Sequence, residues 1–528
     1  MSKRSEKAKK RPEKSQKMRS YDSAIVKIKA EKKSLGSIKT VVTALLILLQ
    51  TVILITLYFE LAQIFKWYLV LSLVLSILCC LYTLASERSP SSKAVWIFII
   101  LFFFYVGYIL FILSDEKFFF RKSKRRYKKV FARAKQFVTD TGDAACADPR
   151  GRQDCAFLKN AGGFNAYRGT DMKYFPSGTQ FFDDVLEKLE EAQDFVFLEF
   201  FIISDGKLFE RFFDVLSRKA QSGVNVCVIY DDMGSHRTLS LKSKLRMKKC
   251  GIHLMSFNRL IPVIDVGLNY RDHRKIVVID GKVAYTGGAN LADEYTNDKR
   301  MYGYWKDEGV RICGAAVDGL TLIFLRQWEF LTRKEADYAR YFNRAEATAN
   351  EATCVPFASG PDMNSPIGKD LYLNVIAKAQ ERLYIMTPYL VPDDAVSDVL
   401  ANKAQSGVDV RIILPDVPDK AVVYKVTLNN AKRLAERGVK ICLMKDSFVH
   451  SKVVLSDYCA VIGSINIDMR SFYQQSESAL YTDDKEVMAQ VAADFEGAFR
   501  ECRSLEERGN ATMGRALAGI LNIISPLM

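Results

Sequence analysis

Two distant segments of the chain share a pattern of three residues whose side chains suit reactions at phosphorus. The pattern is a histidine, a lysine two residues later, and an aspartate five residues after the lysine. Its residues are His273, Lys275 and Asp280 in the first segment, and His450, Lys452 and Asp457 in the second. The chain has only four histidines, so half of them belong to this pattern.

Each histidine and lysine pair can form a phosphate site. Side chains alternate between the two faces of an extended strand, so His273 and Lys275 point to the same side. The ammonium group supplies positive charge and three hydrogen-bond donors for phosphate oxygens. The imidazole, with an ordinary pKa of about 6.5, can act as nucleophile, base or acid. One such pair is weak evidence, but the second pair, His450 and Lys452, makes the interpretation stronger.

Two copies on duplicated domains can meet across a pseudo-twofold interface and place both histidines beside one phosphorus atom. One histidine would then form a phosphohistidine while the other protonates the departing oxygen and later deprotonates the acceptor. The pattern leaves open which histidine is the nucleophile. We expect no metal and no other cofactor, because no ligand cluster of aspartate, glutamate and histidine is evident in the sequence.

The aspartates have two interpretations. Asp280 and Gly281 have the signature of a hairpin turn, and Asp457 occupies the matching turn. The aspartates can therefore hold the turn or take part in the chemistry. Asp307 and Glu477, each before an apolar strand-like segment, are better candidates for carboxylates that orient the imidazoles.

A turn of small residues and an asparagine follow each histidine and lysine pair. These residues are Gly288 and Asn290 in the first copy, and Ser464 and Asn466 in the second. Small side chains allow a close approach, and the amide supplies hydrogen-bond donors. We predict that the four residues bind substrate, and the alternative is an ordinary tight turn.

An internal repeat supports two equivalent domains. The octamer that begins at Lys219 and ends at Val226 returns almost unchanged between Lys403 and Val410. Other matches follow in the same order with nearly the same offset, which indicates duplication. Within the first copy, segments 181–192 and 208–221 are helix-like, and segments 195–203 and 224–230 are strand-like. This alternation predicts a mostly parallel central sheet covered by helices.

The N-terminal part has a different composition. Three apolar runs, at about 41–64, 68–84 and 94–113, approach the roughly 20 residues of a membrane-spanning helix. The net charge of +15 comes from segments 1–39 and 117–135, which flank these runs, and the remainder is slightly acidic. Such flanking charge favours an anionic lipid surface over nucleic acid, although a solvated tail explains residues 1–33 equally well. We predict a multi-pass protein of the cell membrane with its catalytic domains in the cytoplasm.

The expected fold class is therefore transmembrane helices followed by two duplicated α/β domains with one shared active site. The expected parts are a basic disordered tail over 1–36, a membrane domain with two or three transmembrane helices over 37–115, a basic juxtamembrane segment and linker over 116–169, the repeated domains over 170–350 and 351–505, and a C-terminal tail over 506–528. The odd number of cysteines, 11, favours a reducing compartment for the soluble part.

The paired pattern resembles that of the phospholipase D superfamily and, within it, the bacterial cardiolipin synthases. The resemblance rests on Asn269-Tyr-Arg-Asp-His-Arg-Lys275, Thr286-Gly-Gly-Ala-Asn290, Tyr230-Asp-Asp-Met-Gly-Ser235, Thr387-Pro-Tyr-Leu-Val-Pro-Asp393 and Gly463-Ser-Ile-Asn-Ile-Asp-Met-Arg-Ser471. It implies that the histidines, lysines and aspartates of both patterns are the motif residues of two phospholipase D-like domains. It also implies that two phosphatidylglycerols react through a phosphatidyl-histidine to give cardiolipin and glycerol.

The implied partners are phosphatidylglycerol, other anionic phospholipids and the membrane, without nucleic acid and with no prediction of oligomeric state. Two further functions stay open at this point. The first is a phospholipase D-type hydrolase, or a phosphatidyltransferase with another acceptor lipid, because the acceptor depends on pocket shape. The second is a non-catalytic membrane scaffold, which the intact histidine and lysine residues of both copies disfavour.

Overall fold

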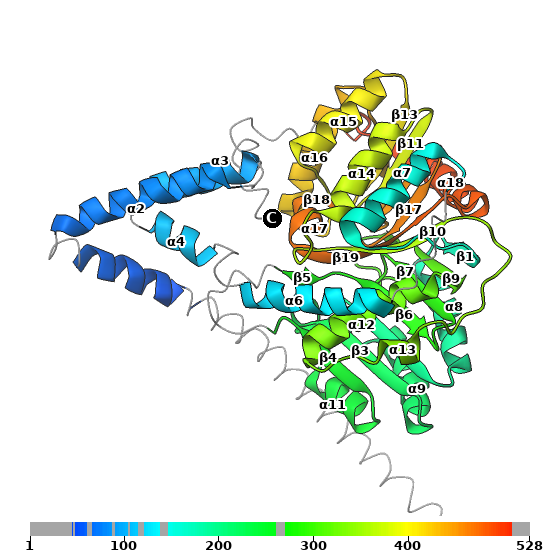
Figure 1. Ribbon diagram of the computed structural model, residues 1–528. Helices are drawn as coiled ribbons and strands as arrows, with labels where there is room; N and C mark the ends of the chain where they lie inside the picture. The colour runs from blue at the N-terminus through cyan, green and yellow to red at the C-terminus, as the bar shows by residue number, and fades with distance from the viewer. Residues whose placement is uncertain are drawn as a thin grey trace, which may run out of the picture. The chain divides into compact units, whose positions relative to one another are not determined.

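The structure is a computed structural model that describes residues 45, 48–60, 66–86, 90–103, 106–114, 121–137, 146–259 and 270–508 (Figure 1). The chain divides into two compact units, each of which is described by itself. Both histidine and lysine pairs lie in the unit formed by Cys80–Ile99, Ser114–Leu260 and Val266–Met528. The other unit comprises Met1–Cys79, Ile100–Leu113 and Ile261–Asp265.

The predicted transmembrane helices are not supported. Among the described residues, no helix is both long enough and apolar enough to cross a membrane. The third apolar run, for example, is divided between α3 (Pro90–Phe102) and α4 (Gly107–Ser114), of 13 and 8 residues, whereas a spanning helix needs about 20. The prediction of a multi-pass membrane domain over residues 37–115, and of a cell-membrane localisation derived from it, is therefore wrong.

The remaining predictions for the N- and C-terminal segments concern the two tails, the second apolar run and the basic segment. The predicted disordered tail, 1–36, and residues 509–528 of the C-terminal tail lie outside the described residues. The second apolar run lies within α2 (Lys66–Ala85). The basic segment after the third run forms α6 (Arg121–Ala134), which is followed by η1 (Lys135–Phe137).

The first sheet has seven strands in the order β1-β9-β7-β6-β2-β3-β4. Its strands are β1 (Thr170–Phe175), β2 (Phe195–Phe200), β3 (Asn225–Asp231), β4 (His253–Phe257), β6 (Lys275–Ile279), β7 (Val283–Gly287) and β9 (Gly309–Gly314). Strands β2, β3 and β4 are parallel, and the other neighbours are antiparallel.

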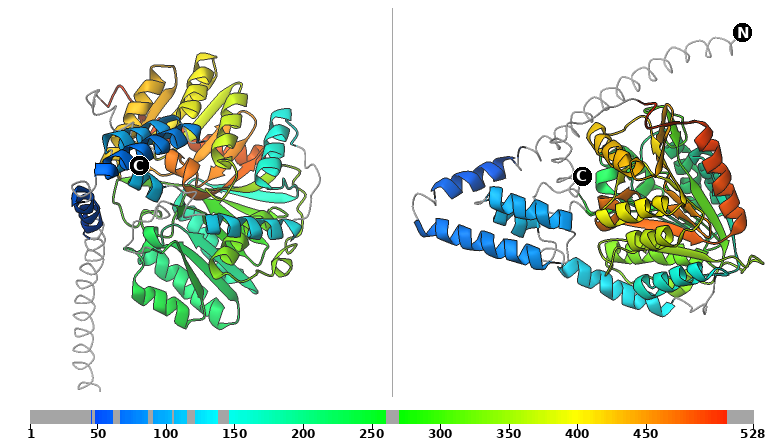
Figure 2. Two further views of the ribbon diagram at one scale, coloured as in Figure 1. Left: turned by 60° about the vertical axis from the view of Figure 1, so that its left-hand side comes forward. Right: turned by 90° about the horizontal axis from the view of Figure 1, so that it is seen from above.

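The second sheet repeats this topology in the order β10-β19-β17-β16-β11-β13-β14-β20. Its strands are β10 (Cys354–Ser359), β11 (Arg382–Met386), β13 (Asp409–Pro415), β14 (Lys440–Met444), β16 (Val453–Ser456), β17 (Ala460–Gly463), β19 (Gln475–Thr482) and β20 (Cys502–Ser504). Strands β11, β13 and β14 are parallel, and the other neighbours are antiparallel. The two halves, green and yellow to red, lie side by side (Figure 2).

Each sheet is therefore mixed, and the prediction of a mostly parallel sheet is wrong. One tight turn in each sheet joins antiparallel neighbours, β6 with β7 and β16 with β17, and longer segments connect the other antiparallel neighbours. In the first sheet, Asp280 and Gly281 adopt φ angles of 52° and 66° and connect β6 to β7 as a hairpin. The predicted hairpin turn is confirmed.

Helices cover both sheets, and the predicted helix–strand alternation of the first repeat is confirmed. The described helices of this unit beyond α6 are α7 (Pro149–Phe157), η2 (Leu158–Gly162), α8 (Gly178–Glu191), α9 (Lys207–Gln221), α10 (Asp232–Ser235), α11 (Leu241–Lys249), α12 (Val317–Thr332), α13 (Tyr338–Tyr341), α14 (Ile367–Lys378), α15 (Asp394–Gln405), α16 (Ala421–Ala435), α17 (Met469–Tyr473) and α18 (Lys485–Arg500). The side chain of Ser177 caps the N-terminus of α8, and that of Asp393 caps α15.

The repeated octamer has a structural explanation. Lys219, at the end of α9, donates from Nζ to the carbonyl of Ala192 at 3.0 Å. Lys403 does the same at the end of α15, with the carbonyl of Ala379 at 3.0 Å. Each lysine thus ties its helix to the C-terminal end of the helix before it, and the following glycine of the octamer turns the chain into the next strand with a positive φ.

Short strands link the two halves. Strand β5 (Arg271–Asp272) pairs with β19 of the second sheet. Strand β15 (Ser447–Val449) pairs with β8 (Tyr304–Lys306) of the first repeat. The remaining pair, β12 (Leu390–Val391) with β18 (Ile467–Asp468), lies within the second repeat. The first two pairs bring the start of each histidine and lysine pair against the other half of the molecule.

A continuous apolar core also joins the halves through α12. Phe324 on α12 stacks on Phe197 of β2, with ring centroids 4.5 Å apart, and both rings are buried. The same buried cluster includes Phe357 of β10 in the second sheet. Helix α12 therefore stabilises the relative position of the two repeats.

We expect Phe324→Ala to lower the free energy of unfolding by about 3–5 kcal/mol, because it leaves a cavity in this core. Urea unfolding of the full chain, followed by tryptophan fluorescence, measures the effect. Phe324→Leu, which retains most of the apolar volume, should lose clearly less. A free energy of unfolding for the alanine variant within about 1 kcal/mol of wild type would contradict the packing role.

Candidate active site

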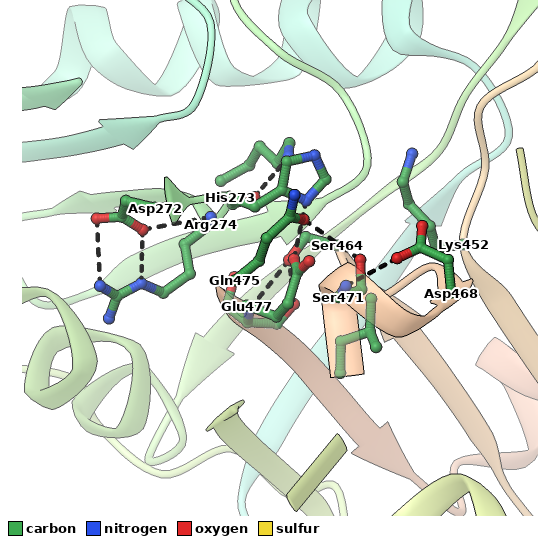
Figure 3. Close-up of polar contacts among 12 residues, drawn as sticks. Asp272, His273, Arg274, Lys452, Ser464, Asp468, Ser471, Gln475 and Glu477 are labelled. Carbon is green, nitrogen blue, oxygen red and sulfur yellow. Dashed lines mark hydrogen bonds and ion pairs between the residues drawn. The ribbon is translucent and has the colours of Figure 1, made fainter. Parts of the chain in front are cut away.

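The first histidine follows β5 and is held by β19 of the second repeat (Figure 3). The backbone N–H of His273 donates to the carbonyl of Ser476 at 2.8 Å. Its Nδ1 lies 2.9 Å from Oε2 of Glu477, which is completely buried. The second repeat therefore positions both the backbone and the ring of the first histidine.

The second histidine has the same arrangement with the repeats exchanged. The backbone N–H of His450 donates to the carbonyl of Lys306 at 2.7 Å. Its Nδ1 lies 2.7 Å from Oδ2 of Asp307, which is also completely buried. Each imidazole is thus paired with a carboxylate from the other repeat, and its second ring nitrogen, Nε2, is the one that does not face that carboxylate.

The two lysines are buried beside the histidines. Nζ of Lys275 donates to the carbonyl of His273 at 2.5 Å, and Nζ of Lys452 donates to the carbonyl of His450. Nζ of Lys452 also lies 2.7 Å from Nδ1 of His450. Burial lowers the pKa of both lysines, that of Lys275 to about 7. An anion entering this site would stabilise both ammonium groups.

Electrostatics connect the four side chains into one site. Burial lowers the pKa of both imidazoles, to about 3 for His450 and well below the ordinary value for His273. The ammonium groups of Lys275 and Lys452 lower both values further. Because each lysine acts on both histidines, the structure brings the predicted pairs together.

The two carboxylates that contact the imidazoles differ in charge. Burial opposes the ionisation of Asp307, but His450 and Lys452 outweigh it and hold the pKa of Asp307 below its ordinary value. Burial raises the pKa of Glu477 to about 7, despite the nearby charge of Lys275. Near neutral pH, the second histidine therefore faces a full negative charge, and the first faces a partly protonated carboxyl group.

The aspartates of the two patterns contact the backbone and not the imidazoles. The carboxylate of Asp280 accepts hydrogen bonds at 2.8 Å from three successive backbone N–H groups, those of Gln193, Asp194 and Phe195. That of Asp457 accepts from the N–H of Gln380 at 2.9 Å and pairs with Arg150 at 2.5 Å. This geometry favours the interpretation that both aspartates hold turns.

In the first copy, the two predicted turn residues, Gly288 and Asn290, contact other residues of the protein. A Cβ atom on Gly288 would lie 2.3 Å from Oδ1 of Asp307, so only glycine leaves room for this carboxylate. The side chain of Asn290 accepts from the N–H of Ile202 at 3.0 Å and donates to the hydroxyl of Tyr295 at 2.7 Å. These contacts do not support substrate binding by either residue.

In the second copy, the two predicted turn residues, Ser464 and Asn466, differ in whether their side chains are already hydrogen-bonded. Oγ of Ser464 donates to Oε2 of Glu477 and accepts from the N–H of Ser478 at 3.0 Å. It therefore positions the carboxyl group that faces the first histidine. Asn466 is buried, and its Oδ1 has no hydrogen-bond partner among the described residues. Of the four predicted substrate-binding residues, Asn466 alone has a side-chain acceptor still available.

Glu308 is a further candidate that the sequence pattern does not single out. It is completely buried, and its Oε1 accepts from the N–H of Lys452 at 3.1 Å. Burial and the adjacent Asp307 raise its pKa. The signal in the sequence is the adjacent pair of acids, Asp307 and Glu308, between β8 and β9. Aromatic rings also enclose the imidazoles, with Phe201 5.1 Å from His273 between centroids.

No group of three or more histidine, cysteine, aspartate and glutamate side chains in the described part of the chain could hold a metal ion. The groups that this arrangement brings together are the imidazoles, the ammonium groups and the buried carboxylates. Together they suit nucleophilic attack on a phosphodiester, with proton transfer by the opposite side chain.

Comparison with known proteins identifies relatives along most of the chain. A family model described as "Cardiolipin synthase, PLD-like domain" matches residues 185–301 and 372–499. A cardiolipin synthase of Alkalihalophilus pseudofirmus is 31% identical over 78% of this chain and 83% of that protein. One of Listeria monocytogenes is 31% identical over 81% of this chain and 91% of that protein. An uncharacterised protein of Streptococcus mutans is 34% identical over 85% of this chain and 99% of that protein.

A solved structure supports the fold. The crystal structure of phosphatidylserine synthase from Haemophilus influenzae superposes with a TM-score of 0.55. It covers 72% of this chain and 98% of that chain at 15% sequence identity. The resemblance found in the sequence is confirmed.

We expect Asp280→Ala to destabilise the protein by at least about 2 kcal/mol, because it leaves three backbone N–H groups without their charged acceptor. Urea unfolding measures the loss. Asp293→Ala is the matched variant. It removes a carboxylate that accepts from the backbone N–H groups of Lys207 and Leu208, so we expect it to lower the free energy of unfolding in the same way. Unchanged stability combined with lost turnover would assign Asp280 to the chemistry.

We expect turnover of a substrate whose leaving group departs without a general acid to increase, at saturating concentration, as the pH rises through and above about 7. Over this range Glu477 ionises, and the carboxylate formed can accept from the Nδ1–H of His273 and make the ring a better nucleophile. Bound phosphodiester keeps Lys275 charged, so its titration does not mask the effect, and the same anion moves the ionisation of Glu477 towards higher pH. Glu477→Gln should abolish this increase and lower turnover by about 10²–10⁴-fold. The same increase in the glutamine variant would rule out Glu477 as its source.

Proposed function

The chain belongs to the family of cardiolipin synthases with phospholipase D-like domains, and from this premise we propose that it transfers a phosphatidyl group from one phosphatidylglycerol to another. The single observation that carries the proposal is the crossed pairing of two imidazoles with two carboxylates around two buried ammonium groups. We take its repeats to be residues 170–350 and 351–505. Phospholipids are its substrates, and phosphatidylglycerol in both positions is our specific assignment.

In the first step, Nε2 of His273 attacks the phosphorus of phosphatidylglycerol. The bond between phosphorus and the headgroup oxygen breaks, and glycerol leaves with a proton from His450. The product is a phosphatidyl group bonded to the imidazole. The ammonium groups of Lys275 and Lys452 neutralise the charge that builds on the nonbridging oxygens.

In the second step, a headgroup hydroxyl of another phosphatidylglycerol gives its proton to His450 and attacks the same phosphorus. The bond between phosphorus and Nε2 breaks, and the electron pair returns to the imidazole of His273. Cardiolipin leaves, and the protonated His450 is ready for the next cycle. The proton balance closes without a cofactor.

The partner carboxylates support this assignment of roles. A general acid must hold a proton, and the ionised Asp307 favours a protonated ring at His450. A nucleophile must be neutral, and His273 faces Glu477, whose pKa is raised to about 7. The negative charge of a bound phosphodiester offsets the two ammonium groups, so the pKa of His450 rises when substrate enters.

We expect purified protein in detergent with phosphatidylglycerol as sole lipid to produce cardiolipin and glycerol in equal amounts. His273→Ala and His450→Ala should each lower turnover by at least about 10⁴-fold, because the two residues act as a unit. Lipid chromatography and a glycerol assay measure both products. Phosphatidic acid in place of cardiolipin would identify a hydrolase, and wild-type turnover in either variant would exclude the two-histidine mechanism.

A substrate with a p-nitrophenyl leaving group separates the two roles, since this group departs without a general acid. With it, His450→Ala should release one burst equivalent of nitrophenolate and retain a lipid on His273, which mass spectrometry of the peptide detects. His273→Ala should give no burst. A burst in His273→Ala and none in His450→Ala would identify His450 as the nucleophile and His273 as the acid–base residue.

A further inference from the structure

A small pocket lies beside the active site, and Arg274, which follows His273 in the chain, is one of the residues that line it. Residues 272 and 274 alternate with His273 and so point to the other face of this extended segment (Figure 3). Helices α6 and α12, the end of β10 and the start of β19 form its walls. It is lined by Tyr127, Arg274, Ile323, Arg326, Gln327, Ala358, Ser359, Asp362, Met363 and Ser476.

One of these side chains is a buried cation without a polar partner. Arg326 is only 9% exposed, and it makes no hydrogen bond or ion pair with any residue that the structure describes. Its guanidinium carbon lies 4.0 Å from the centroid of the Phe131 ring. Burial lowers the pKa of Arg326 to about 10, so it remains charged at neutral pH.

The other polar groups of the pocket are mostly engaged with one another. Arg274 donates from Nε to Oδ1 of Asp272 at 2.9 Å and pairs with Glu199 at 3.2 Å. Gln327 donates to Asp272 at 3.1 Å and accepts from the hydroxyl of Tyr127 at 2.7 Å. These contacts hold the walls in place, and they leave Arg326 as the available cation.

Three more groups could meet a ligand. Oγ of Ser359 accepts from the N–H of Gly368 at 3.0 Å, and its own proton can still be donated. Ser476 also lines the pocket. Asp362 contributes a half-buried carboxylate, which raises the pKa of Arg326 but forms no ion pair with it within 4.0 Å in the described structure.

We propose that this pocket binds one phosphate group, with Arg326 as its principal contact and Ser359 and Ser476 as hydroxyl donors. A buried charge is costly unless an opposite charge accompanies it. The planar fork of a guanidinium matches the oxygens of a phosphate, and it is less strongly hydrated than an ammonium group. The phosphate belongs either to a soluble phosphomonoester or to a phospholipid headgroup.

Helix α6 gives such a ligand an approach. Its inner side packs on α12, where the ring of Tyr127 stacks on that of Phe330 with centroids 3.6 Å apart. Its outer side exposes Lys124, Arg125, Lys128 and Lys129. This basic surface raises the local concentration of anions beside a pocket that Tyr127 itself lines.

The site is separate from the reacting histidines but joined to one of them. The backbone carbonyl of Ser476 accepts from the N–H of His273, and Arg274 follows that histidine in the chain. Occupancy of the pocket therefore acts on the segment that carries the nucleophile. The inference goes beyond the proposed function, because it concerns a second phosphate that is not consumed.

Calorimetric titration of the full chain with inorganic phosphate tests the proposal without turnover. We expect two equivalents to bind to wild type, one in each site, and one to bind to Arg326→Met. The double variant Lys275→Ala/Lys452→Ala should also retain one equivalent. Arg433→Met, which removes an exposed arginine from α16, is the matched control and should retain both. Two equivalents in Arg326→Met, or none in the double-lysine variant, would overturn the proposal.

Asp362→Asn provides a test that does not depend on the folding of Arg326→Met. It removes a carboxylate that repels phosphate, so phosphate should bind to the pocket of the double-lysine variant about 5–10-fold more tightly. An unchanged affinity would contradict the location of the site. Displacement by phosphatidylglycerol micelles, but not by phosphatidylcholine micelles, would identify a lipid headgroup, and displacement only by glycerol 3-phosphate would identify a soluble ligand.

Discussion

Each imidazole of the site is held by a carboxylate from the opposite repeat, and the rest of the structure depends on this exchange. Strand β5 pairs with β19, and β8 pairs with β15. This backbone pairing places His273 beside Glu477 and His450 beside Asp307. Neither repeat alone contains a complete histidine and carboxylate pair. Packing through α12 and the chemistry at phosphorus are therefore linked, because any shift between the repeats separates both pairs at once.

The site balances charges that would be unstable separately. Burial lowers the pKa of both histidines and both lysines, while Asp307 stays ionised and Glu477 is partly protonated near neutral pH. A phosphodiester brings a negative charge that stabilises the protonated forms of these groups. Substrate binding and the protonation of the catalytic groups are therefore coupled, because the charge of the bound phosphodiester changes the pKa values of these groups.

The sequence predicts some parts of this site better than others, for physical reasons. Spacing predicts that His273 and Lys275 share one face, although His273 lies between β5 and β6 and not within a strand. The alternation of helix-like and strand-like segments predicts the order of elements in the first repeat. The alternation of helices and strands covers only the parallel strands β2, β3 and β4, and the antiparallel neighbours lie outside it, so a mostly parallel sheet was the wrong expectation. Asp280 illustrates a second limit, since its motif position does not show that its carboxylate is used by three backbone N–H groups. The exchange between repeats involves residues about 140–200 positions apart, which no local pattern reveals.

The two positions that hold the imidazoles carry different acids, Asp307 and Glu477, and this difference has a consequence for the history of the fold. In a symmetric dimer of identical single-repeat chains, both crossed contacts would be made by the same residue, because a twofold axis makes them equivalent. Joining two repeats in one chain removes that constraint. Each position can then mutate independently. Two histidines with different roles, one the nucleophile and the other the acid–base residue, can therefore be encoded separately only in the fused chain.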